Sequence, residues 1–424
     1  MASKAVVLIG GPSKGTRMRP LSLDIPKPLF PIAGRPIIWH GIQALSKVEG
    51  LKEVILIGFY DNDVINPFVK EANRDFPSLN IRYMREYQSL GTAGGLYHFR
   101  DLILKGNPQQ VFVLHADICC SFPLAEIKAF HDRHRGVGTI LAVKVPKETA
   151  NKYGCIVMNH DTKQAIHYVE KPETFISDII NGGVYLFDRA IFDEIKSAMD
   201  LRVKQAAEDP SSLGDEESAD EQLRLEQDVI APLVSQKKLF VYESRSFWRQ
   251  IKTAGSAVPA NTLLLNSYKH SNPKLLRQRS PTVITRPTAE QTASDRRLTA
   301  EIVEPCFIDE TATIDPTAKV GPNVSIGANV KIGFGARVKD AIILDRTVLE
   351  ANSIVMHAIV SENCRIGQWA RVEGRVLVSD SGAARDSIAI LAKEVTVKRE
   401  CSIRSCIVLP QKSLDRSFAD QVLL

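Results

Sequence analysis

An apolar run, Ala5–Ile9 (AVVLI), leads directly into Gly10–Leu21 (GGPSKGTRMRPL) near the start of the chain. The run predicts a buried strand, and the glycines predict a loop at its carboxyl end. Because glycine has no Cβ, backbone amides in such a loop can approach a phosphate closely. The cations Arg17, Arg19 and Lys27 follow and would add charge at phosphate oxygens. We therefore expect a polyphosphate nucleotide site, although a purely structural strand–helix turn also fits the glycine pair.

The bulk composition bounds the class of protein. At 424 residues, with 44% hydrophobic and 24% charged residues, the chain is long enough for two domains with separate cores. A net charge of +5 does not indicate nucleic-acid binding. No secretory pattern and no apolar run of membrane-spanning length is present. The seven cysteines lack zinc-type spacing. We expect a cytoplasmic protein with buried free thiols and no nucleic-acid or membrane partner.

Residues 1–270 alternate between expected strands and helices. The expected strands are Ala5–Ile9, Glu53–Ile57, Gln110–Leu114, Thr139–Val143 and Gly183–Phe187, and helical patterns lie at Pro36–Val48 and Ala125–His134. This alternation predicts a Rossmann-like α/β domain with a mostly parallel sheet covered on both faces. Ligands of such sheets bind at the carboxyl ends of strands, where the glycine loop and Asp117 are expected.

Two segments interrupt this pattern. The acidic stretch Glu208–Asp220 is nearly free of apolar residues and predicts a surface loop. Residues 271–300 hold three prolines among many charges and predict a linker between the domains.

Residues 301–424 contain an internal repeat of six. The expected inward residues form three registers: Ile308, Ile314, Val320, Ile326, Ile332, Val338; then Ile342, Val348, Ile354, Val360, Ile366, Val372; then Leu391, Val397, Ile403, Leu409. A strict period of six predicts a hexapeptide β-helix rather than a sandwich. The breaks near 340 and at 375–387 predict loops that leave the coil. Solenoids of this kind commonly serve assembly.

The glycine loop, Pro26–Leu29 and segments along nearly the whole chain resemble the nucleotidyltransferases that make nucleotide sugars from sugar 1-phosphates. Their usual loop is Gly-Gly-x-Gly-Thr-Arg, and the gap between Gly11 and Gly15 is two residues longer here. That longer gap is typical of the alpha-type branch of the mannose-1-phosphate guanylyltransferases. The resemblance implies a left-handed coil and attack of a sugar 1-phosphate on the α-phosphorus of a nucleoside triphosphate, a reaction that depends on positioning and positive charge.

The same resemblance assigns the nucleotide site. It implies nucleotide contacts at Leu8, Gly10, Gly11, Gly15, Thr16, Gly91, Thr92 and Asp117, and, if the chain turns over, catalytic roles for Arg17, Lys27 and Lys171. Leu90–Gly95 resembles the base-recognition loop; it would also serve as a turn before a helix that we expect to begin near Leu96.

Three further segments match sugar-contact stretches of the family: Tyr153–Gly154, Glu170–Pro172 and Asn181–Gly183. The implied sugar-site residues are Gly154, Glu170, Lys171 and Asn181. Taken alone, an exposed Glu–Lys pair is usually a solvated surface, so the set depends on its order along the chain. His98 and His115 have no metal or triad spacing, and we expect them to be structural or solvent-facing.

The expected Mg²⁺ site is incomplete. Asp117 stands where the family carries one metal-binding aspartate, although a strand-end aspartate is also a common turn residue. The second aspartate position falls in Phe247–Lys252 and holds Gln250. A neutral amide binds a hard cation less well than a carboxylate, and Lys252 adds positive charge. Any Mg²⁺ site is therefore expected to be weak.

Three functions remain open at this point. The first is a regulatory alpha subunit that binds GDP-mannose and feeds back on a catalytic beta subunit in a homo- and hetero-oligomer. By the same resemblance, the feedback would act through a β-helix insertion that can be long in alpha-type relatives. The corresponding segment here, Arg375–Ser387, is short, which weakens this route. The second is a working enzyme that joins GTP and mannose 1-phosphate. The third, a subunit of the nucleotide-exchange factor of translation initiation, is disfavoured because the repeat runs almost to Leu424.

Overall fold

The computed structural model describes residues 3–11, 16–208, 222–276, 282–283, 300–378 and 384–424. Contacts divide the chain into two compact units, Met1–Lys14 with Ile38–Trp248, and Gly15–Ile37 with Arg249–Leu424. The bounds of these units differ from those of the two predicted domains, because Gly15–Ile37 and residues 249–276 group with the coil. Gly15, most of the acidic stretch Glu208–Asp220 and most of the 271–300 segment lie outside the described residues.

The first unit is built on a nine-stranded sheet with the order β10–β9–β11–β6–β1–β4–β5; β8 pairs with β11, and β12 pairs with β8. The strands are β1 (Ser3–Gly10), β4 (Leu51–Gly58), β5 (Asn80–Arg85), β6 (Gln110–His115), β8 (Gly138–Lys144), β9 (Gly154–Met158), β10 (Ala165–Glu170), β11 (Ile179–Asp188) and β12 (Leu239–Ser244). The five strands expected from the sequence are confirmed. β1 lies between β4 and β6, which explains why its run is uniformly apolar.

The sheet is mixed, which corrects the expectation of a mostly parallel one. β1 pairs in parallel with β4 and β6, but β11 runs antiparallel to β6, β8 and β9. β9 and β10 are joined by a short connection, and a short connection requires antiparallel pairing.

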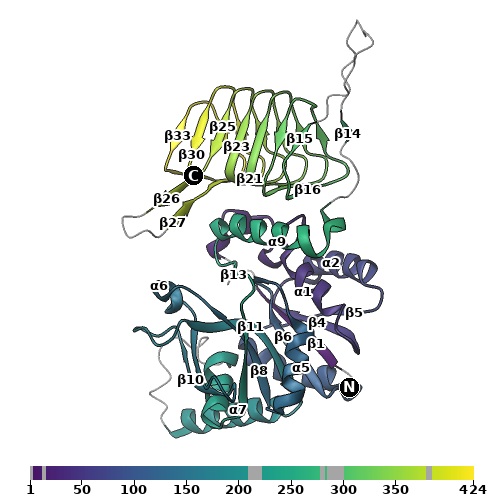
Figure 1. Ribbon diagram of the computed structural model, residues 1–424, viewed down its shortest axis with the longest axis vertical. Helices are drawn as coiled ribbons and strands as arrows, with labels where there is room; N and C mark the ends of the chain where they lie inside the picture. The colour runs from purple at the N-terminus through teal and green to yellow at the C-terminus, as the bar shows by residue number, and fades with distance from the viewer. Residues whose placement is uncertain (1–2, 12–15, 209–221, 277–281, 284–299, 379–383) are drawn as a thin grey trace, which may run out of the picture. The chain divides into compact units, whose positions relative to one another are not determined.

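Helices cover both faces of this sheet, as expected (Figure 1). They are α1 (Ile37–Leu45), α2 (Asn62–Asp75), α3 (Gly91–His98), α4 (Arg100–Leu104), α5 (Leu124–His134), α6 (Lys147–Ala150), α7 (Ile191–Glu208), a π-helix (Leu225–Ile230) and α8 (Ala231–Ser235). One core joins Val6, Leu8, Ile55 and Ile57 of the sheet to side chains of α3, α7 and the π-helix. On the other face, the ring nitrogen Nδ1 of His131 in α5 lies 2.8 Å from Oγ1 of Thr139 in β8.

The second unit contains a parallel β-helix. Its strands form three columns. One column holds β14 (Thr282–Val283), β17 (Thr313–Ile314), β20 (Lys331–Ile332), β22 (Val348–Leu349), β24 (Arg365–Ile366), β29 (Thr396–Val397) and β32 (Ser413–Leu414). The other two share β21 (Arg337–Ile343) and β23 (Ile354–Val360), which bend around a corner, and add β15 (Glu301–Ile302), β16 (Cys306–Ile308), β18 (Lys319–Val320), β19 (Val324–Ile326), β25 (Arg371–Glu373), β28 (Ala389–Leu391), β30 (Ser402–Arg404), β31 (Ile407–Val408), β33 (Phe418–Ala419) and β34 (Val422–Leu423).

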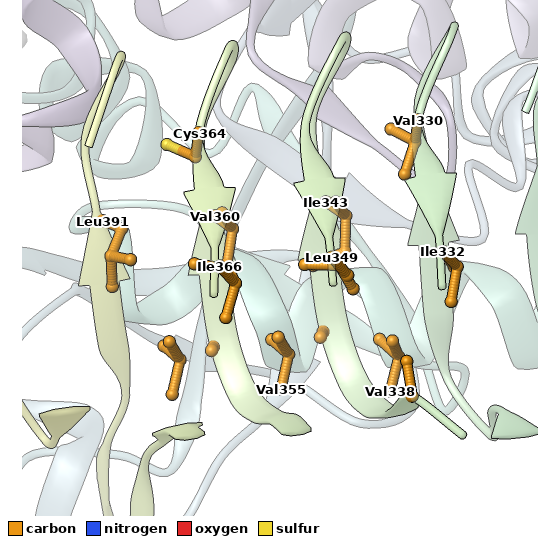
Figure 2. Close-up of a cluster of buried hydrophobic side chains, with 14 of the residues drawn as sticks. Val330, Ile332, Val338, Ile343, Leu349, Val355, Val360, Cys364, Ile366 and Leu391 are labelled. Atoms are coloured by element: carbon orange, nitrogen blue, oxygen red, sulfur yellow. The ribbon is translucent and has the colours of Figure 1, made fainter. Parts of the chain in front are cut away.

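The interior of the coil is a stacked apolar column (Figure 2). The first predicted register, Ile308 to Val338, is buried as expected. The second is shifted by one residue over its first half, because Ile343, Leu349 and Val355 belong to the core while Val348 and Ile354 are only half-buried. In the third register, Val408 likewise occupies the inward position that was predicted for Leu409. Aliphatic residues stand at both candidate positions in each case, so periodicity alone could not separate them.

The shift has a geometric cause. Val320 pairs with Val338, a repeat of 18 residues, but Val338 pairs with Val355 and Val355 with Val372, a repeat of 17. One corner of the coil near residue 340 is therefore one residue shorter. The sequence predicted a loop at this point, and that prediction is wrong. A loop does leave at 375–387, where β26 (Arg375–Val378) and β27 (Ala384–Ser387) form an antiparallel hairpin.

The second unit also contains elements outside the β-helix, including the paired strands β2 (Pro31–Ile32) and β3 (Arg35–Pro36). The strand β13 (Trp248–Gln250) spans the division between the units, and α9 (Ala257–Ser271) packs along the β-helix (Figure 1). The seven cysteines are free and buried, as expected. Within the described residues, no helix has the length and apolar character needed to cross a membrane.

Candidate functional site

The predicted nucleotide residues of the first unit meet at the carboxyl ends of β1 and β6. Leu8 is aligned with His115, and the amide of Ala116 donates to the carbonyl of Leu8 at 3.0 Å. Asp117 follows one residue later and is half-buried. Leu8, Gly10 and Asp117 therefore belong to one edge of the sheet, where ligands of α/β sheets bind.

The two glycines after β1 are required by the backbone path. Gly10 adopts a left-handed φ of 68°. A Cβ on Gly11 would lie 2.7 Å from Cβ of Phe59, closer than real side chains approach. Both observations explain why the chain turns sharply here with small residues. They support the predicted loop without assigning it a ligand.

The other predicted phosphate-site residues fall in the second unit or outside the described residues. Gly15 is not described. Thr16 and Arg17 are exposed on a short 3₁₀ turn, Lys27 begins another, and Gln250 ends β13. The nucleotide roles of Gly15 and Thr16 and the catalytic roles of Arg17 and Lys27 stay predictions.

The expected base-recognition segment is helical from Gly91, which corrects the expected start near Leu96. Gly91 has a φ of 79°, and a Cβ there would lie 2.3 Å from the carbonyl oxygen of Leu223. The hydroxyl of Thr92 accepts the amide of Leu225 at 2.8 Å. Glycine-rich sequence has low helix propensity, but here packing against residues 223–225 stabilises the helix. Thr92 therefore has a structural contact beside its predicted nucleotide role.

A connected polar network lies on the sheet beside this edge, centred on Asn181 of β11. Its side-chain amide donates to the hydroxyls of Tyr168 at 3.2 Å and Tyr185 at 2.8 Å. Tyr168 donates to Glu170 at 2.8 Å, and Tyr185 donates to Glu226 at 3.1 Å. Burial raises the pKa of both tyrosines, so both keep the protons that they donate.

The orientation of Asn181 follows from this network. Carboxylates only accept hydrogen bonds, so each tyrosine proton points to a carboxylate and each tyrosine oxygen accepts from the amide. The amide oxygen of Asn181 in turn accepts the backbone N–H of Gly183 at 2.8 Å. Asn181 therefore fixes the two tyrosines and offers a ligand only a remaining acceptor position on its oxygen.

Glu170 is the carboxylate of this network that reaches the surface beside a cation. Its side chain is 20% exposed and lies 3.4 Å from Nζ of Lys171, which is 64% exposed. Gly154 is required here, because a Cβ would lie 2.1 Å from the Tyr168 hydroxyl and 2.7 Å from Oε2 of Glu170. Three of the four predicted sugar-site residues thus meet at one place, with Asn181 behind them. A held carboxylate beside an ammonium suits a ligand with hydroxyl and phosphate groups.

The other end of the network is an ion pair. Nε2 of His115 lies 3.0 Å from Oε1 of Glu226, with both side chains about one-fifth exposed. Burial alone would lower the pKa of His115, but the facing carboxylate outweighs it and holds that pKa above its ordinary value. Burial alone would raise the pKa of Glu226, but His115 holds it below its ordinary value. Both shifts favour the charged forms of the pair, and the structural role expected for His115 is that of Glu226's partner.

Sequence reasoning missed Tyr168, Tyr185 and Glu226. Tyr168 is two residues before Glu170 on β10, so strand alternation puts both on one face. Glu226 is the second residue of the π-helix Leu225–Ile230, whose sequence LEQDVI mixes polar and apolar residues. Nothing in the sequence links Glu226 to His115, because the pairing depends on how the π-helix packs.

The described residues do not provide the group of anionic oxygen ligands that a strong Mg²⁺ site needs. Among the described residues, no three His, Cys, Asp or Glu side chains are grouped so that they could hold a metal ion. Asp117 is the one carboxylate predicted as a ligand, and the second position holds the neutral Gln250. Hard divalent cations favour several anionic oxygens. We therefore derive no chemical step through Mg²⁺.

Comparison with known proteins identifies the family. The nucleotidyl transferase family model matches residues 4–230, and the GMPPB C-terminal domain model matches residues 302–423. A Schizosaccharomyces pombe protein assigned as a mannose-1-phosphate guanyltransferase is 44% identical, with 100% of both chains covered. This chain belongs to the mannose-1-phosphate guanylyltransferase family. The regulatory subunit alpha-B of that enzyme from Danio rerio is 44% identical over 99% of this chain and 100% of its own.

Other relatives agree with this family assignment. The regulatory subunit alpha from Dictyostelium discoideum is 44% identical over 100% of this chain and 99% of its own. A solved structure from Bacillus anthracis, assigned as a glucose-1-phosphate thymidylyltransferase, matches with a TM-score of 0.50 at 21% identity over 62% of this chain and 95% of its own. That likeness supports a nucleotidyltransferase fold in this guanylyltransferase-family chain.

Proposed function

We propose that this chain is a regulatory, alpha-type member of the guanylyltransferase family that binds GDP-mannose and feeds back on a catalytic beta subunit. One contrast carries the proposal. The predicted sugar-site residues Asn181, Glu170 and Lys171 are linked through Tyr168 in one polar network, whereas the predicted second metal-ligand position holds Gln250, with Lys252 two residues later. A protein that only senses product needs a site for the sugar and does not need a complete metal site.

The proposed binding mode uses groups of this chain alone. The carboxylate of Glu170 would accept sugar hydroxyls, and the ammonium of Lys171 would lie against a phosphate oxygen. Leu8, Gly10, Gly91 and Asp117 would surround the nucleotide at the carboxyl edge of the sheet. The beta subunit and further copies of this chain would assemble through the β-helix in a cytoplasmic hetero-oligomer.

Thermal unfolding against a panel of nucleotide sugars tests the binding claim. At a ligand concentration 100 times Kd, stabilisation is about 2.7 kcal/mol, which raises Tm by several degrees. We expect protection by GDP-mannose, and more than by UDP-glucose or ADP-glucose. Glu170→Gln should reduce the protection, while Glu173→Gln, an exposed control three residues away, should keep it. No protection by GDP-mannose contradicts the proposal.

A working enzyme is the second candidate, because Asp117, Lys27 and Lys171 are retained and substrate phosphates can complete a metal shell. The purified chain is assayed with GTP, mannose 1-phosphate and Mg²⁺. On the regulatory proposal, pyrophosphate release stays near background and rises in a Gln250→Asp, Lys252→Gly variant. Robust release by the natural chain that Asp117→Ala abolishes would establish the enzyme instead.

A further inference from the structure

A cavity of ≈ 340 Å³ lies within the second unit, at the first turns of α9 and the base of the β26–β27 hairpin. Its ionisable lining residues are Arg249, Asp340, His357 and Arg375, and Thr262 adds a hydroxyl group. The lining is otherwise mainly apolar and includes Leu263 and Ile388. Apolar walls with a few convergent polar groups are the usual composition of small-molecule sites.

The fold explains why space is left here. Asn323 is a corner residue of the coil, with a left-handed φ of 61°, and α9 covers it closely. The amide of Asn261 donates to the carbonyl of Asn323 at 3.2 Å, and that of Asn266 donates to its side-chain oxygen at 3.2 Å. Asp340 and His357, also left-handed, stand at the equivalent corners of the next two coils and line the cavity instead.

The charge of the lining is predominantly positive. The carboxylate of Asp340 already has other partners, because it accepts the amide of Asn323 at 2.8 Å and lies 3.8 Å from Nζ of Lys339 and 3.8 Å from Nε2 of His357. Arg375 lies at 3.9 Å from Asp420, an exposed and weak pairing. Two guanidinium groups, Arg249 and Arg375, thus line a space with one acidic side chain, which has contacts of its own. Guanidinium groups bind phosphate through paired hydrogen bonds.

We propose that this cavity is an effector site for a small organic phosphate: the phosphate pairs with Arg249 and Arg375, and an apolar body packs between α9 and Ile388. Arg375 is the first residue of the hairpin and Arg249 lies on β13, so the ligand would tie together two segments that are far apart in sequence.

The backbone links the cavity to the polar network around Asn181. This part of the inference rests on the proposed function. Arg249 is preceded by Trp248, whose indole N–H donates to the carbonyl of Gly182 at 2.9 Å. The Trp248 ring packs edge-on against Tyr153 at a centroid distance of 5.4 Å. Gly182 directly follows Asn181. One peptide bond joins Arg249 to Trp248. A movement of Arg249 toward a bound phosphate therefore displaces Trp248, which contacts the segment that carries Asn181.

The next residue gives a second route. Arg249 and Gln250 are neighbours on a strand, so their side chains point to opposite faces. A phosphate held on the Arg249 face would fix the position of Gln250, which stands where relatives carry the second metal ligand. The expected result is that occupancy of the cavity changes affinity for GDP-mannose.

Phenyl phosphate, which joins a phosphate to an apolar ring, is the probe for this site. It is titrated into the full-length chain by calorimetry, with inorganic phosphate and benzoate as partial probes. We expect phenyl phosphate to bind at least fivefold more tightly than either. Arg249→Gln with Arg375→Gln should weaken binding at least tenfold, and Leu263→Trp should weaken it by filling the apolar part. Arg399→Glu, an exposed charge change elsewhere on the coil, should leave it unchanged.

The outcomes separate the two proposals. Equal binding by natural and double-Gln chains, or no binding of phenyl phosphate by the natural chain, overturns the effector site. If phenyl phosphate binds and changes the Kd for GDP-mannose at least threefold, the coupling is supported; if that Kd does not change, the coupling is overturned. A chain that binds phenyl phosphate but not GDP-mannose retains the cavity and loses the proposed function. Circular dichroism of each variant confirms that it is folded.

Discussion

The core of the β-helix is buried and the polar network of the first unit is partly exposed, and the two are held by different forces. The coil stacks aliphatic side chains from one turn to the next, and its tolerance depends on volume and register (Figure 2). The network joins Glu226, Tyr185, Asn181 and Tyr168 to Glu170 through hydrogen bonds, and His115 forms an ion pair with Glu226, so the tolerance of the network depends on partners. The first arrangement suits a scaffold, and the second suits a site that recognises polar groups.

The largest expected effect is a cavity in the coil. Leu349 is 1% exposed and lies in the stacked core, so Leu349→Ala should lower the free energy of unfolding by about 2–5 kcal/mol. The neighbouring Val348→Ala, at the half-buried position that periodicity favoured, should cost less than about 1 kcal/mol. Urea unfolding of both variants measures the difference. Equal costs would contradict the register described here.

Removing one partner of the network should have the next largest effect. Glu226→Ala leaves His115 facing a void and removes the acceptor of Tyr185. Because both side chains are partly exposed, we expect a loss of about 2–3 kcal/mol, below the usual range for a fully buried pair. Glu226→Gln, which keeps an acceptor for the tyrosine, should cost less. A fully neutral Glu226→Ala would show that the ion pair does not stabilise the fold.

The pH dependence of the same pair gives a smaller effect. Because the folded-state pKa of His115 is raised above 6.5, its contribution is complete below that pH and is lost as the pH rises through the raised value. Because the folded-state pKa of Glu226 is lowered below 4.5, its contribution is complete above that pH and is lost as the pH falls through the lowered value. The stability difference between the natural chain and His115→Gln should therefore be greatest between 4.5 and 6.5. Urea midpoints across pH check this, and a difference that grows at high pH contradicts it.

The smallest effect is expected at a single hydroxyl. Tyr168→Phe removes the donor to Glu170 and the acceptor for Asn181, at a cost of about 0.5–1.5 kcal/mol in stability. Its effect on GDP-mannose affinity should be larger than that of Tyr97→Phe, a tyrosine on α3 outside the network. Calorimetric titration compares the two variants. Unchanged affinity in Tyr168→Phe would mean that the network does not position Glu170 for a ligand.

Much of this molecule could be predicted from local sequence. The strand Ala5–Ile9 and its following glycines, the period of six in the second half, and the buried state of the cysteines are each confirmed. These features depend on hydrophobic periodicity and on positions that admit only glycine, and both are properties of neighbouring residues. The grouping of Gly154, Glu170 and Lys171 came instead from the resemblance to the nucleotidyltransferase family and the order of its motifs along the chain.

Tertiary packing decided what remained. Both Val348 and Leu349 are apolar, so the sequence does not show which of them points into the coil. Leu349 does so because one corner of the coil is one residue shorter, and the register with the neighbouring coils shows this. The pairing of His115 with Glu226 joins residues 111 positions apart, and the cavity beside Arg249 depends on where α9 stops covering the coil. Sequence determines which side chains must be buried and where the chain can turn; which buried polar groups meet is decided only when distant elements pack, since a hydrogen bond requires a partner at a fixed distance and angle.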